Sequence, residues 1–187
     1  MSFAAVVASR RRNAGPPPTY IVGDSGLSGG GNWPASGDRG LFAPFLLDRT
    51  AHLISFNMRT RGASAGGNRF KGVVYAADAG GAPIGGVARP GTLLAVSDQS
   101  DVIGAGALAL QMPISGTIAP GWIWIGYTAN GSGVGSGSET DSGGTNANQT
   151  IMFNGSLTFA TPPNPAPTWP GSPGPYGNVP SVWLVYS

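Results

Sequence analysis

The stretch RFKGVVYAADAGGAPIGGVARPGTLLAVSD, residues 69–98, decides the fold that the sequence predicts. Residues 70–77 are apolar and partly β-branched, residues 78–90 are rich in Gly and Pro, and residues 92–97 are apolar again. Two apolar runs joined by such a segment are typical of two strands and the turn between them. The stretch therefore predicts a β-hairpin with a long turn.

A second stretch, APGWIWIGYTAN at residues 119–130, predicts a central strand. Its aromatic and β-branched residues follow one another from Trp122 to Tyr127 instead of alternating with polar ones. A run of this kind is typical of a strand with both faces covered. We therefore expect a strand over residues 121–129, with Trp122 and Trp124 in the core.

Residues 51–61 alternate most clearly between apolar and polar side chains. One face of this run carries His52, Ile54, Phe56 and Met58. We expect this face to lie in the core. Further strands are expected at residues 19–22, 41–47 (with a break at Pro44), 107–114, 149–159 and 181–186, the last with Trp183 in the core.

No segment shows a sustained helical repeat. Eight or nine short strands separated by Gly- and Pro-rich turns predict an all-β chain, an antiparallel β-sandwich of the jelly-roll type. We expect one such domain over residues 19–187, preceded by an extended N-terminal arm over residues 1–18. Residues 131–146, rich in Gly, Ser and Thr, are expected to form a surface loop.

The composition points to assembly rather than to a freely diffusing monomer. Only 10% of the residues are charged, against about 25% in an ordinary soluble protein. A surface with so little charge tends to associate. The chain has no cysteine, which excludes disulfides, thiolate metal sites and a cysteine nucleophile.

The basic residues lie in the first half of the chain. Residues 1–89 hold ten basic and four acidic residues, whereas residues 90–187 hold four acidic residues and no basic one. The only basic run is Arg10, Arg11 and Arg12, which is too short for a nucleic-acid footprint. We expect these arginines to belong to an arm that docks on a partner. We expect no secretion signal, because the basic residues follow the short apolar run at residues 3–8 instead of preceding it, and no membrane span, because no stretch has the necessary length.

Several motifs together resemble a known family. They are Tyr75, Asp78, Gly80, Gly81 and Pro83, the run Gly91-Thr92-Leu93-Leu94-Ala95 with Ser97 and Asp98, the strand 121–127, the turn Pro173-Gly174-Pro175-Tyr176-Gly177, and the aromatic end 183–186. This order resembles jelly-roll domains of bacteriophage virion proteins and bacterial surface proteins. The resemblance covers residues 50–187 and departs from the family pattern at residues 84–90, which lengthen the hairpin loop.

The resemblance implies a non-enzymatic virion component, displayed on a capsid or tail and assembled in the cytoplasm of a bacterial host. Its expected partners are other virion proteins, reached through the N-terminal arm with Arg10 to Arg12, and further copies of itself. Neither a cofactor nor nucleic acid is expected. Because some relatives resemble carbohydrate-binding modules, an alternative function is attachment to a host-surface polysaccharide.

Sugar binding would use exposed aromatic faces that stack on pyranose rings, with amide and carboxylate groups at their edge. The aromatic candidates in predicted loops are Trp33, Trp169 and Tyr176. Asp78 and Asn130 are the polar candidates. Packing is the competing interpretation for each of the aromatic residues, since most aromatic side chains are buried.

One short motif resembles a catalytic block. Gly23-Asp24-Ser25-Gly26-Leu27 is similar to the nucleophile segment of GDS-type lipases. A serine nucleophile needs a base, and the only histidine, His52, is expected on a buried strand face. We therefore interpret the motif as a tight turn and keep a hydrolase that uses Ser25 as a third hypothesis.

Acidic residues close in sequence could bind calcium through their oxygen atoms. The candidates are Glu139 with Asp141, Asp98 with Asp101, and Asp78. None has the spacing of a defined calcium loop. We expect these residues to be solvated turn acids rather than metal ligands.

Overall fold

The computed structural model describes residues 16–24, 39–61, 69–78, 87–100, 108–130, 137–138, 140–141, 151–154, 157–167 and 179–187. Within these ranges the chain is all-β, as the sequence predicts, and no helix there is long and apolar enough to cross a membrane. The strands are β1 (Tyr20–Gly23), β2 (Arg39–Leu47), β3 (Ala51–Arg61), β4 (Phe70–Ala77), β5 (Pro90–Gln99), β6 (Leu108–Pro113), β7 (Thr117–Ile118), β8 (Gly121–Ala129), β9 (Gly137–Ser138), β10 (Thr140–Asp141), β11 (Ile151–Asn154), β12 (Val179–Pro180) and β13 (Val182–Tyr186).

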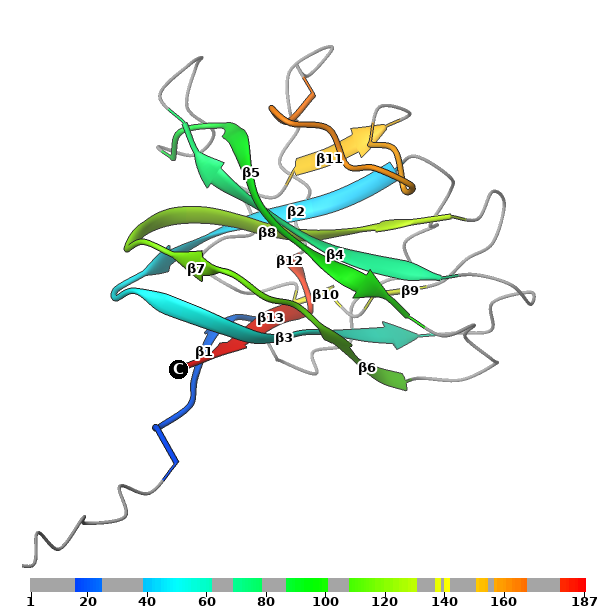
Figure 1. The fold of residues 1–187 in the computed structure, drawn as a ribbon. Coiled ribbons are helices and arrows are strands. Elements are labelled where there is room, and N and C mark those ends of the chain that lie inside the picture. Colours follow the sequence, from blue (N-terminus) through cyan, green and yellow to red (C-terminus); the bar gives the residue numbers. More distant parts are fainter. Residues whose placement is uncertain are drawn as a thin grey trace, which may run out of the picture.

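The strands form two antiparallel sheets stacked as two layers (Figure 1). One sheet has the order β1-β13-β3-β6, with β7 and β9 also paired to β3, and is called here the β3 sheet. The other has the order β11-β2-β8-β4-β5 and is called the β8 sheet. Since neighbours in both sheets come from distant parts of the sequence, most pairings are long-range. The short strands β10 and β12 pair separately.

The main core lies between the two sheets. Strands β2, β4 and β8 contribute their inward residues from one side, and strands β3 and β13 from the other. Fully buried members include Leu47, Phe56, Met58, Val74, Ile125 and Leu184. Burial of each such side chain contributes about 1.5–3 kcal/mol. The predicted strand 121–129 is confirmed as β8, and it occupies the centre of its sheet.

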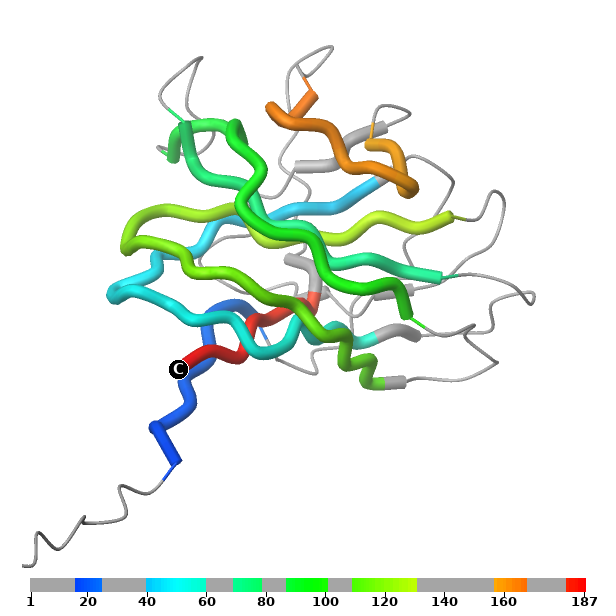
Figure 2. Tube along the Cα trace, in the orientation of Figure 1, coloured from blue at the N-terminus to red at the C-terminus, as the bar shows by residue number. Residues whose placement is uncertain are grey.

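A second apolar cluster lies on the outer face of the β8 sheet, between the sheet and the segments that cover it. It contains Phe42, Val73, Tyr75, Val87, Trp124 and Leu157. The covering segment, residues 157–167 (orange in Figure 2), is tied to the sheet by side chains that donate to its carbonyl oxygens. The Tyr75 hydroxyl donates to Pro163 O at 2.9 Å, and Thr128 Oγ1 donates to Leu157 O at 3.2 Å. This cover explains why β8 needs apolar residues on both faces.

Strand β3 changes its inward face part-way along. The expectation that His52 and Ile54 are buried is wrong, because both are exposed, while Phe56 and Met58 are buried as expected. Consecutive residues Val185 and Tyr186 of β13 pair with Ser55 and Leu53, so that Ile54 is an extra residue at a bulge. A bulge shifts the alternation by one residue.

Close approach of the two sheets requires a glycine in β4. A Cβ placed on Gly72 would collide with the ring of Phe56 from β3. Phe56 therefore fills the space that a side chain at position 72 would occupy.

Three smaller predictions differ from the structure in whole or in part. Strand β2 continues through Pro44, which pairs with Trp124, so the expected break there is wrong. Of the region expected as a strand at 149–159, residues 151–154 form β11, whereas the described residues 157–159 are not strand. Part of the loop expected at 131–146 forms the short strands β9 and β10.

Candidate functional site

Two large apolar side chains lie exposed next to each other on the outer face of the β8 sheet. Leu46 in β2 pairs with Trp122 in β8, and their exposed fractions are 57% and 42%. Their chain neighbours Phe45, Leu47 and Ile123 point into the core. The expectation that Trp122 is buried is therefore wrong, and the two residues are called here the Leu46–Trp122 pair.

The cover of the β8 sheet stops short of this pair. Two residues further along β8, Trp124 is fully buried and its indole Nε1 donates to Ala88 O at 2.8 Å. Trp122 projects from the same face of the strand as Trp124, because side chains alternate with a period of two. The two tryptophans differ in burial because residues distant in sequence cover only one of them.

The turn after Leu46 is held against the first strand. Arg49 lies over the ring of Tyr20, with its guanidinium carbon 4.3 Å from the ring centroid, and it also pairs with Asp48 at 3.0 Å. Hydrogen bonds from Arg49 hold the pKa of the Asp48 carboxyl below its ordinary value. Tyr20 in turn packs on Tyr186, with 5.6 Å between ring centroids. The start of β1 is thereby fixed against Arg49, which follows Leu46 by three residues in the sequence.

Asp78, a candidate for sugar contact, has its carboxylate bound within the β4–β5 hairpin. Asp78 Oδ2 accepts hydrogen bonds from Thr92 N at 2.6 Å and from Thr92 Oγ1 at 2.9 Å. A Cβ on Gly91 would collide with this carboxylate. The contact gives Asp78, Gly91 and Thr92 a structural role in closing the hairpin.

Asn130, the second polar candidate, joins the ends of β8 and β4. Its side-chain oxygen accepts a hydrogen bond from Arg69 N at 2.8 Å, and its own backbone N donates to Arg69 O at 3.2 Å. Asp78 and Asn130 thus each bind backbone of this chain. The remaining predicted site residues, Trp33, Trp169, Tyr176 and Arg10 to Arg12, lie outside the described residues.

His52 does not occupy the buried position that the sequence predicts. Its ring lies exposed, with Nδ1 3.0 Å from Thr117 Oγ1. Ser25, the serine of the lipase-like motif, lies outside the described residues. The structure therefore gives no distance between these two residues.

The outer face of the β3 sheet carries a basic side chain from β3 next to an aromatic one from β13. Arg59 lies beside Trp183, with its guanidinium carbon 5.7 Å from a ring centroid of the indole. Trp183 is partly buried on this outer face rather than in the core, which corrects the sequence-based expectation. Within β3 itself, Asn57 Nδ2 donates to Ser55 Oγ at 2.9 Å.

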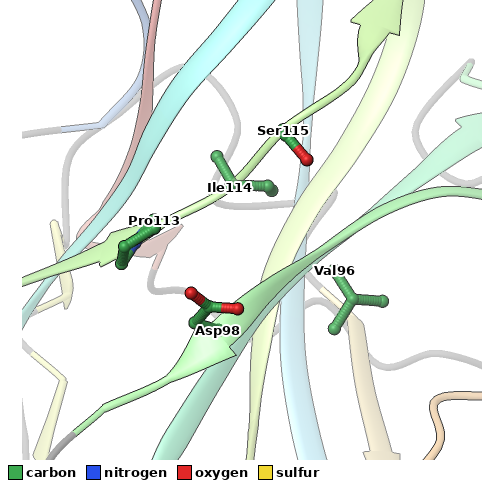
Figure 3. A pocket seen from close by; sticks show the side chains of 5 residues that line it. All are labelled: Val96, Asp98, Pro113, Ile114 and Ser115. Carbon is green, nitrogen blue, oxygen red and sulfur yellow. The ribbon is translucent and has the colours of Figure 1, made fainter.

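A shallow hollow of about 130 Å³ opens between β5 and the end of β6 (Figure 3). Its lining includes Asp98, one of the calcium candidates, together with Val96, Pro113, Ile114 and Ser115. The described residues contain no group of three or more His, Cys, Asp or Glu side chains able to hold a metal ion. Glu139 and Asp101, the possible acidic partners, lie outside those residues.

Comparison of the chain with models of protein families, with curated proteins and with solved structures gives no match.

Proposed function

We propose that this chain is a non-enzymatic structural component of a bacteriophage virion, displayed on a capsid or tail as an oligomer. The proposal starts from the family resemblance of residues 50–187. Its N-terminal arm, residues 1–18, would attach it to other virion proteins. It would assemble in the cytoplasm of the bacterial host.

The order of the strands supports a jelly roll. Among the strands β1 to β6, β8 and β13, the chain crosses from one sheet to the other at β1–β2, β2–β3, β3–β4, β5–β6, β6–β8 and β8–β13, and it stays within one sheet at β4–β5. Without β7, β9 and β11, which are added at the margins of the two sheets, these strands form two four-stranded groups, β1-β13-β3-β6 and β2-β8-β4-β5. Eight strands in two antiparallel sheets are the architecture of the jelly roll.

One observation carries the proposal for a structural role. Three residues of the resemblance, Tyr75, Asp78 and Ser97, use their polar groups to hold the sandwich together. Tyr75 binds the covering segment through Pro163 O, Asp78 binds Thr92, and Ser97 Oγ accepts a hydrogen bond from Gly72 N at 2.8 Å. Conversely, the largest apolar side chains left exposed include the Leu46–Trp122 pair, which suits contact with another protein.

Location of the chain in purified particles tests the proposal. Phage particles that carry a tagged copy of the chain are imaged by cryo-electron microscopy, and their protein content is measured by mass spectrometry. We expect a fixed copy number per particle and symmetric density for the sandwich. A chain found only in lysate, with particles complete without it, would refute the virion role.

The alternative function is a carbohydrate-binding module for host attachment. The half-exposed indole of Trp122 supports it, because an exposed indole can stack on a sugar ring. Its paired neighbour Leu46 is apolar, however, and offers no hydrogen bond to sugar hydroxyls. Binding of host polysaccharide to the chain and to Trp122→Ala, measured by calorimetry, tests this function, and equal heats for both variants count against it.

A further inference from the structure

We propose that the Leu46–Trp122 pair is the docking site for the apolar segment Phe3–Val7 of a second copy of this chain. The inference rests on the proposed assembly role and names the contact through which two copies would associate. The association itself can be measured on the purified chain, apart from any particle.

The site is an apolar surface with a defined boundary. Leu46 and Trp122 lie directly opposite each other on paired strands, where Cβ atoms are about 5 Å apart. Next to them, Pro44 and Trp124 form the following pair, and both are buried. The Leu46–Trp122 pair is thus the uncovered end of an apolar face whose other end is covered by this chain itself.

The chain reaches the sandwich at the turn that follows Leu46. Tyr20, the first residue of β1, packs under Arg49 of the turn that follows β2. Residues 16–19 before it are exposed and lead away from the sandwich (Figure 1). Their three consecutive prolines have φ fixed near −65°, which favours an extended backbone. This direction favours delivery of the preceding residues to a neighbouring copy rather than back to the same one.

The chain before Pro16 has sufficient length and suitable chemistry. Residues 1–15 can span up to roughly 50 Å when extended. Phe3-Ala4-Ala5-Val6-Val7 is their apolar run, and it is followed by the basic residues Arg10 to Arg12. An apolar segment matches an exposed leucine and tryptophan, since burial of both surfaces is favourable. A sugar or a charged peptide would leave its polar groups unpaired on this pair.

The first test compares full-length variants by analytical ultracentrifugation over a range of protein concentrations. One variant carries Leu46→Ser with Trp122→Ser, and a second carries Phe3→Ser with Val6→Ser. Ile54→Ser is the matched control, because Ile54 is 45% exposed and lies on the β3 sheet, away from the pair. Circular dichroism checks that each variant keeps its β-sheet content.

We expect concentration-dependent association of the wild type. Each double variant should weaken it by roughly tenfold or more, the usual effect of losing a buried aromatic anchor. Combining the two should weaken it little further, because both remove the same contact. The control should associate like the wild type. A wild type that stays monomeric, or an arm variant that associates normally, would overturn the proposal.

The second test identifies which copy supplies the segment. Chains with the photo-crosslinker p-benzoylphenylalanine at position 122 are mixed with ¹⁵N-labelled chains and irradiated. We expect crosslinked peptides that join position 122 of one isotope to residues 1–12 of the other. Crosslinks only within one copy, or only between the Leu46–Trp122 pairs of two copies, would overturn the docking of residues 3–7 on this pair. Neither result would alter where microscopy locates the chain in a particle, so failure of the docking is distinguishable from failure of the virion role.

Discussion

The carboxylate of Asp78 holds Thr92 by two hydrogen bonds, one to its backbone N at 2.6 Å and one to its hydroxyl at 2.9 Å. The contact spans the hairpin loop between β4 and β5 and joins residues 14 positions apart in the sequence. Asp78, an acidic residue of the motif that resembles the phage family, therefore has a structural role in the hairpin. The hairpin closes against it without room for a side chain at Gly91.

Replacement of Asp78 tests this role. Asp78→Ala should lower the free energy of unfolding by about 1–3 kcal/mol, because Thr92 loses both hydrogen bonds to one charged acceptor. Asp78→Asn keeps an acceptor oxygen at the same place and should lose less than half as much. Urea unfolding followed by tryptophan fluorescence measures both. Equal losses for the two variants would mean that the hydrogen bonds do not stabilise the hairpin.

Gly72 and Phe56 provide a second prediction. Gly72→Ala should destabilise the chain by about 1–3 kcal/mol, since the new methyl group overlaps the Phe56 ring. In the background of Phe56→Leu the same substitution should cost clearly less, because the smaller side chain leaves space. A double-mutant cycle from thermal unfolding measures the coupling between the positions. An identical cost of Gly72→Ala in both backgrounds would contradict the proposed contact.

The phenol of Tyr75 predicts a dependence of stability on alkaline pH. Burial raises the pKa of the Tyr75 hydroxyl above its ordinary value. Deprotonation is therefore easier in the unfolded chain, and the stability that this group contributes is complete below about pH 10 and is lost as the pH rises further. Tyr75→Phe should lower stability at pH 7 by about 1 kcal/mol through loss of the bond to Pro163 O.

The same variant should lose less stability than the wild type between neutral and alkaline pH, so that the two curves converge above about pH 10. Burial also raises the pKa of Tyr186, and some alkaline loss should therefore persist in Tyr75→Phe. Urea unfolding at a series of pH values measures both curves. Curves that run parallel across the whole range would show that Tyr75 is not the group responsible.

The attachment of the covering segment gives a fourth prediction. Asn164 Oδ1 accepts a hydrogen bond from Leu93 N at 3.0 Å, and Ala166 N donates to Gly91 O at 2.7 Å. Asn164→Ala should speed hydrogen exchange at Ala166 N by roughly fivefold, the equivalent of about 1 kcal/mol. Asn164→Asp keeps the acceptor and should exchange more slowly than Asn164→Ala. Unchanged exchange in both variants would mean that the segment is held by other contacts.

The strands could be predicted from the sequence because their signal is local. Residues 51–61 and 121–129 were expected as strands with the bounds that β3 and β8 have. Alternation, β-branched residues and flanking Gly or Pro are properties of a few neighbouring residues. The all-β class and the β4–β5 hairpin followed from the same local signals.

The roles of single side chains could not be predicted in this way. Whether Asp78 contacts a ligand or Thr92 depends on how the hairpin closes. Whether His52 is buried depends on a bulge that arises from pairing with Val185 and Tyr186. Nothing within residues 51–61 marks that bulge, because a bulge is a feature of the pairing between two strands.

The sequence by itself determined where the long strands β3 and β8 lie and that the described residues are all-β. The tertiary structure alone decided which faces of those strands are covered. Trp122 and Trp124 have the same chemistry and project from the same face of one strand, yet only Trp124 lies beneath Ala88 and its neighbours. The physical reason is that strand formation depends on neighbours along the chain, whereas burial depends on residues that only folding brings near.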